Sequence, residues 1–70
     1  MKRRDLIKRI AAEARQTNIE WMVIREGANH SLYQLGRVMI PIPRHSEIGA
    51  GLTEAIFKQC EPELGERWWK

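Results

Sequence analysis

Two short segments of this 70-residue chain carry side chains that can move protons or bind anions. In residues 27–30 (Gly-Ala-Asn-His), a histidine directly follows turn-forming residues, which favours an exposed imidazole at His30. Imidazole accepts and releases protons near neutral pH, so His30 is a candidate general base. A metal-free ribonuclease needs such a group, because the ribose 2′-hydroxyl must lose its proton before its oxygen attacks the adjacent phosphorus. The alternative is an exposed histidine that has no task or that caps the turn.

The second segment is Pro41–Ile48, in which two prolines precede Arg44 and His45. Proline fixes the backbone φ angle, so the segment presents these two side chains from a stiff base. The guanidinium group of Arg44 can bind a phosphate through two parallel hydrogen bonds. His45 is a second proton-transfer group or a further contact to the substrate. The alternative is a solvent-facing pair in a loop shaped by proline.

Two further arginines, Arg25 and Arg37, flank turns, and we expect both to lie near His30. A guanidinium group there can stabilise the charge that develops on a pentacovalent phosphorus, whereas ordinary strand-end charges are the alternative. Trp21 and Tyr33 can stack on RNA bases, but we expect these aromatic residues to pack in the small core.

The helices that frame these residues follow from apolar periodicity. From Lys2 to about Arg15, apolar residues recur at helical spacing along one stripe, which predicts a helix. The same spacing returns from about Gly49 to Cys60, and Glu61-Pro62 ends this second helix, since the residue before proline avoids the helical region. Cys60 lies on the apolar stripe, and we expect it to be a buried small hydrophobe.

Between the helices the pattern changes to that of β-structure. Ile19–Arg25 is rich in β-branched and aromatic residues, and Ser31–Leu35 and Arg37–Ile42 follow after turn residues. Short connections favour an antiparallel meander, and Pro41, which has no N–H to donate, indicates an edge strand or a strand end. The order α-β-β-β-α predicts an α+β fold in which a three-stranded antiparallel sheet carries two helices on one face.

The length allows one small domain with a thin core. We assign residues 1–60 to this domain and residues 61–70 to a C-terminal tail whose secondary structure the pattern does not define. Trp68 and Trp69 are poor candidates for a solvated end, so we expect them to pack on this chain or on a partner.

The composition excludes several classes of protein. The single cysteine rules out an intramolecular disulfide framework, and with two histidines we expect no metal site and no cofactor. No stretch approaches the roughly 18 apolar residues of a membrane helix. Lys8, Arg9 and Glu13 interrupt the residues after the basic start, so we expect no signal peptide and predict a cytoplasmic protein without a membrane partner.

The charge is unevenly distributed along the chain. Residues 1–45 carry nine basic and four acidic side chains, a net charge of +5, whereas residues 46–70 carry three and five, a net charge of −2. Phosphate contacts dominate the affinity of proteins for nucleic acids, so the basic first part fits an RNA or DNA partner. Ordinary solvation of helix faces is the alternative.

The basic N-terminal helix, the segment Val23–His30 and the loop Ile42–Ile48 together resemble the HicA family of toxins, and the resemblance extends from Met1 to about Cys60. It implies the double-stranded-RNA-binding-domain fold, mRNA as substrate, and a metal-independent endoribonuclease activity (an mRNA interferase) that a HicB-type antitoxin neutralises. It also implies that His30, which follows the glycine-containing turn, is the catalytic histidine.

The hypothesis is therefore a ribonuclease in which His30 is the general base, with RNA-binding roles assigned on physical grounds to four cationic positions: Arg25, Arg37, Arg44 and His45. Residues 49–54 start the last helix without a basic residue, so we do not expect the usual contact to duplex RNA. A non-catalytic RNA-binding module that blocks translation is the alternative. A protein-interaction domain that docks through its tryptophans is a third possibility.

Overall fold

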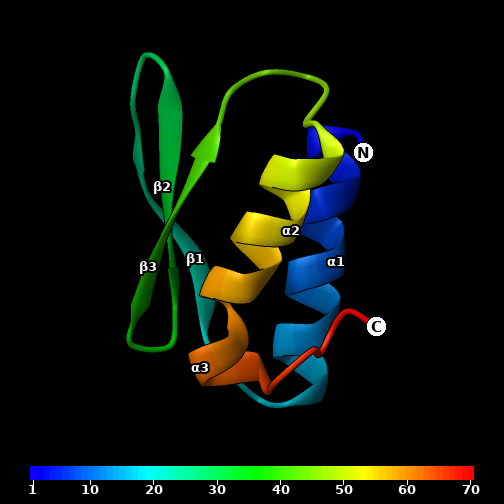
Figure 1. Cartoon of the computed structure of the whole chain (residues 1–70). Helices are drawn as coiled ribbons and strands as arrows, with labels where there is room; N and C mark the ends of the chain where they lie inside the picture. The colour runs from blue at the N-terminus through cyan, green and yellow to red at the C-terminus, as the bar shows by residue number, and fades with distance from the viewer.

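A three-stranded antiparallel sheet carries two helices on one of its faces (Figure 1). The computed structural model describes all residues from Met1 to Lys70. The elements are α1 (Arg3–Gln16), β1 (Trp21–Glu26), β2 (His30–Leu35), β3 (Val38–Pro43), α2 (Ala50–Gln59) and α3 (Glu61–Leu64). The predicted α+β class and the order α-β-β-β-α are thus confirmed, with the short α3 as an addition.

The sheet has the order β1-β2-β3, so β2 is central and each neighbouring pair is antiparallel. Pro41 lies in the edge strand β3, where a residue without an N–H is tolerated because one side of the strand has no partner strand. β1 starts at Trp21, two residues later than predicted, because Asn18 adopts a φ angle of 61° that reverses the chain after α1. The N–H of Ile19 closes this reversal on the carbonyl of Ala14 at 2.7 Å.

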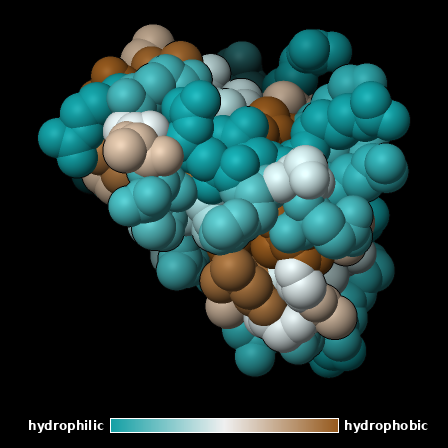
Figure 2. Space-filling model, turned by 90° about the horizontal axis from the view of Figure 1, so that it is seen from above, coloured by the Kyte–Doolittle hydropathy of each residue, from teal (hydrophilic) through white to brown (hydrophobic).

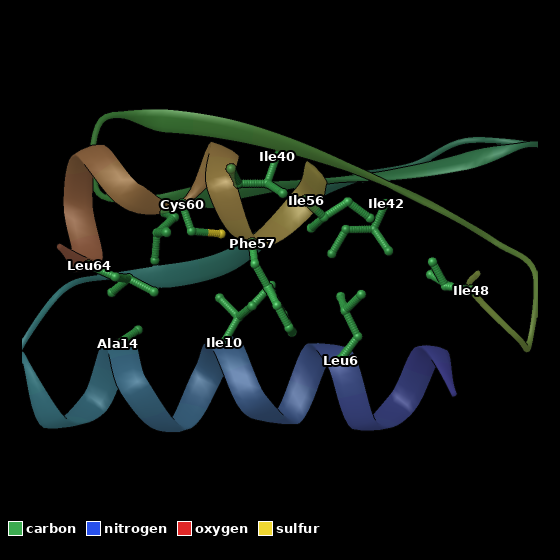
Figure 3. Packing of buried hydrophobic residues seen from close by; sticks show 11 residues of the cluster. Leu6, Ile10, Ala14, Ile40, Ile42, Ile48, Ile56, Phe57, Cys60 and Leu64 are labelled. Atoms are coloured by element: carbon green, nitrogen blue, oxygen red, sulfur yellow. The ribbon is translucent and has the colours of Figure 1, made fainter. Parts of the chain in front are cut away.

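The core lies between the sheet and the helices (Figure 3). Leu6, Ile10 and Ala14 come from one face of α1, as their helical spacing predicts. Ile40 and Ile42 come from the helix-facing side of β3. The remaining buried members of the cluster are Leu35, Ile48, Ile56, Phe57, Cys60 and Leu64.

The C-terminal segment folds back onto this chain. α3 follows directly after Cys60, and Pro62 lies in its first turn, where an N–H would have no partner in any case. The indole N–H of Trp68 donates to the carbonyl of Phe57 at 2.8 Å, and the Phe57 ring meets the Trp68 ring edge-on at 4.9 Å between centroids. Arg9 donates to the carbonyl of Trp69 at 2.7 Å, which attaches the end of the chain to α1.

Cys60 is fully buried at the C-cap of α2, and this burial raises the pKa of its thiol to about 12. At pH 8 only about one thiol in ten thousand is then ionised in the folded protein. We expect iodoacetamide to leave Cys60 unmodified in buffer and to modify it within minutes in strong denaturant, as mass spectrometry would show. Equal labelling under both conditions would contradict the packing of this helix end.

None of the helices is both long enough and apolar enough to cross a lipid bilayer.

Candidate nucleic-acid interface

His30 is the first residue of β2, and the main chain fixes it on two sides. Its carbonyl accepts the N–H of Gly27 at 2.8 Å, and its Cα is paired with that of Pro43 in β3. The N–H of Arg44 donates to the carbonyl of Asn29 at 3.0 Å, so the loop after β3 is attached to the turn before β2. The side chain of His30 is exposed on this fixed frame.

A close steric contact explains why residue 27, the first of the Gly-Ala-Asn-His segment, is a glycine. A Cβ atom on Gly27 would lie 2.8 Å from the carbonyl oxygen of His30, closer than real Cβ contacts allow. Any other residue would push apart the two strands of this turn. The glycine therefore sets the position at which His30 enters the sheet.

The direction of the His30 side chain follows from the alternation of β2. Ser31 is fully buried and faces the helices, so His30 and Leu32 lie on the outer face of the sheet. Arg25 is paired with Leu32, which places it on the same outer face as His30 and diagonal to it. The prediction that Arg25 lies near His30 is confirmed.

A β-bulge produces this arrangement. The register of β1 with β2 shifts between Val23 and Arg25, so that Ile24 has no partner of its own. In an unbroken ladder Arg25 would oppose Ser31 and point toward the helices. The extra residue turns the guanidinium group of Arg25 to the outer face instead.

Arg37, by contrast, lies far from His30. It follows β2 in the turn to β3, and its N–H donates to a carboxylate oxygen of Glu63 at 3.2 Å. The length of β2 separates this turn from His30 by about 17 Å. The prediction that Arg37 lies near His30 is wrong, because the two turns of a three-stranded meander lie at opposite ends of the sheet (Figure 1).

The side chain of Arg44 turns away from His30 toward the helices. Its Nη1 donates to Glu26 Oε1 at 2.8 Å, and the same oxygen accepts the hydroxyl of Ser31. Ser31 Oγ in turn accepts Nη2 of Arg3 at 2.7 Å. Arg3 also donates through Nε to the carbonyl of Pro43 at 2.8 Å. These bonds connect α1 with the ends of all three strands.

A hollow of about 380 Å³ lies beside this network and contains no hydrophobic lining residue. We call this hollow the N-terminal pocket. Its lining residues are Lys2, Arg3, Arg4, Arg44, Ser46 and Glu47. The lining thus carries four cationic groups and one carboxylate. Figure 2 views this end of the molecule and shows hydrophilic side chains over most of the surface.

Residues 2–4, which line this hollow, are not among the candidate residues named from the sequence. A signal was present, because basic residues in the first turn of a helix oppose the helix dipole, which favours anions there. Three consecutive basic residues at that place do not stabilise the helix. Their position is therefore not explained by the stability of the helix.

The remaining candidate residues are His45, Trp21 and Tyr33. His45 is exposed in the loop after β3, next to Arg44. Trp21 and Tyr33 stack on one another, with ring centroids 4.5 Å apart, and both pack against the core. We therefore assign this aromatic pair to packing and not to base recognition.

Nowhere in the chain do three or more histidine, cysteine, aspartate or glutamate side chains form a group that could hold a metal ion. Comparisons with family models, with curated proteins and with solved structures found no match.

Proposed function

We propose that this chain is a HicA-type toxin, a cytoplasmic endoribonuclease that cleaves mRNA without a metal ion and is neutralised by a HicB-type antitoxin. The observation that carries the proposal is the placement of His30. Its exposed imidazole stands on a fixed main chain, shares the outer sheet face with Arg25, and lies beside the cationic end of the molecule.

In the proposed reaction, His30 accepts the proton of a ribose 2′-hydroxyl, and the oxygen attacks the adjacent phosphorus. The bond from phosphorus to the 5′-oxygen then breaks, and the leaving oxygen takes up a proton from the imidazolium or from water. The products are a 2′,3′-cyclic phosphate and a 5′-hydroxyl. The guanidinium group of Arg25 offsets the negative charge of the pentacovalent phosphorus.

The fold supports a relation to double-stranded-RNA-binding domains through its element order and its two helices on one sheet face. The start of α2, however, presents Ala50, Gly51 and Leu52, which are exposed and uncharged. Contact to duplex phosphates at this helix start has no cation to support it. We therefore propose single-stranded RNA as the substrate.

The test is incubation of the purified protein with end-labelled single-stranded RNA in buffer that contains EDTA. We expect fragments to accumulate with time and protein concentration. Intact RNA that shifts in a native gel would replace the ribonuclease by the alternative, a module that blocks translation by binding. Intact RNA without a shift would overturn the proposal.

A further inference from the structure

We propose that the N-terminal pocket binds a phosphate group of the RNA other than the one that is cleaved. The inference rests on the proposed function for the identity of the polymer. It goes beyond that function because it assigns residues 2–4, which the catalytic proposal does not use, to a second phosphate site.

The chemistry of the lining selects an anion. Four cationic side chains and Ser46 surround the hollow, and no hydrophobic residue offers a surface for a base or another apolar group. The one carboxylate, from Glu47, lies 3.0 Å from the α-amino nitrogen of Met1 and is 68% exposed. A volume of about 380 Å³ admits a phosphate group together with some of its water.

The pocket is also held in shape before any ligand arrives. The N–H of Arg3 donates to the carbonyl of Ser46 at 2.9 Å, and the N–H of Ile48 donates to the carbonyl of Met1 at 2.8 Å. This short bridge attaches the loop after β3 to the start of α1. The guanidinium groups of Arg3 and Arg44 are fixed in turn by Ser31 and Glu26.

Two cations of the pocket remain available for a ligand. Lys2 is exposed and forms no ion pair, and the side chain of Arg4 is 75% exposed with a loose 4.0 Å contact to Asp5. Both stand where the helix dipole disfavours a positive charge, so the folded protein alone gains little from them. A bound phosphate reverses this disadvantage, because the dipole and the cations then attract the same anion.

The phosphate in the pocket is not the one that is cleaved beside His30. Ser31, which binds Arg3, faces the helices, whereas His30 faces the outer side of the sheet. The two sites are nevertheless close along the chain, because His30 and Ser31 are neighbours in β2. An RNA strand therefore passes around this end of the sheet, with one phosphate in the pocket and the next ones near His30.

The experiment measures binding of a fully 2′-O-methylated RNA oligonucleotide, which has no 2′-hydroxyl to attack and so reports binding without cleavage. The variant Lys2→Gln/Arg4→Gln is compared with Lys8→Gln/Arg15→Gln, a control that removes the same charge from exposed positions of the same helix. We expect the pocket variant to bind about tenfold more weakly and to lower the salt slope by about 1.4, and the control to change affinity by about twofold or less.

Further binding measurements identify which phosphate of the RNA occupies the pocket. An oligonucleotide with a 5′-phosphate that binds more tightly than its 5′-hydroxyl counterpart assigns the pocket to the terminal phosphate, and equal affinities assign it to an internal diester. Glu47→Gln is expected to tighten binding several-fold, because it removes the only carboxylate of the lining. Circular dichroism of each variant confirms that the fold is retained.

Equal weakening by the pocket variant and the control would overturn the second site, even if the protein cleaves RNA. Polyglutamate that binds the wild-type protein but not the pocket variant, while RNA binds both equally, would assign the pocket to an acidic protein partner and overturn the RNA site. Pocket-dependent binding by a protein that does not cleave RNA would uphold the site and overturn the ribonuclease, so the two failures are distinguishable.

Discussion

Replacement of His30 by alanine is expected to lower the rate of RNA cleavage by about 10²- to 10⁴-fold, the usual contribution of a general base. The same change should abolish growth arrest when the protein is expressed in a bacterial host. Because the His30 side chain is exposed, we expect the stability to change by no more than about 0.5 kcal/mol. The measurements are single-turnover cleavage, growth after induction, and urea denaturation.

His45→Ala is the matched control, because it removes an exposed imidazole two residues after the cross-strand partner of His30. We expect this variant to cleave RNA within about tenfold of the wild-type rate, as for the loss of a single RNA contact. Equal losses in both variants would assign the effect to RNA binding. A His30→Ala variant that cleaves at the wild-type rate would remove His30 from the mechanism.

Replacement of Phe57 by alanine is expected to cost about 3–5 kcal/mol of folding free energy. A domain of this length has a total stability of only about 4–10 kcal/mol, so the variant should lose about a third of it or more. Phe57 is 3% exposed, and its ring contacts the rings of Trp68 and Trp69, so its loss opens a cavity and releases the C-terminal segment.

The control for this prediction is Leu52→Ala, in the same helix, whose side chain is 47% exposed. We expect its stability to stay within about 0.5 kcal/mol of the wild type, because little apolar surface is lost from the core. Urea titrations followed by far-UV circular dichroism measure both variants. Similar midpoints for the two variants would contradict the position of Phe57 in the core.

The helices and strands could be predicted because their periodicity is local. The stripe that contains Leu6, Ile10 and Ala14 became the buried face of α1, and Pro41 lies in an edge strand as its missing N–H indicates. The start of β1 was placed too early, because a turn through Asn18 with positive φ leaves a weak sequence signal. The helix α3 was not predicted, since four residues are too few for a periodic pattern.

The site was only partly predictable, because side-chain direction depends on register. The exposed position of His30 follows from the turn before it. The outward direction of Arg25 depends on the bulge at Ile24, and the inward direction of Arg44 depends on Glu26, which is distant in sequence. Arg37 was misplaced because its distance from His30 depends on which end of the sheet each turn occupies.

The most direct test of the central claim is the chemistry of the fragment ends formed from single-stranded RNA in EDTA. Mass spectrometry of the fragments should find a 2′,3′-cyclic phosphate, or the 3′-phosphate formed by its hydrolysis, opposite a 5′-hydroxyl. A single 2′-O-methyl group at the cleaved nucleotide should prevent cleavage there, because the attacking oxygen is blocked. Fragments that end in a 3′-hydroxyl and a 5′-phosphate, or cleavage at the methylated nucleotide, would contradict a mechanism in which His30 activates the ribose 2′-hydroxyl.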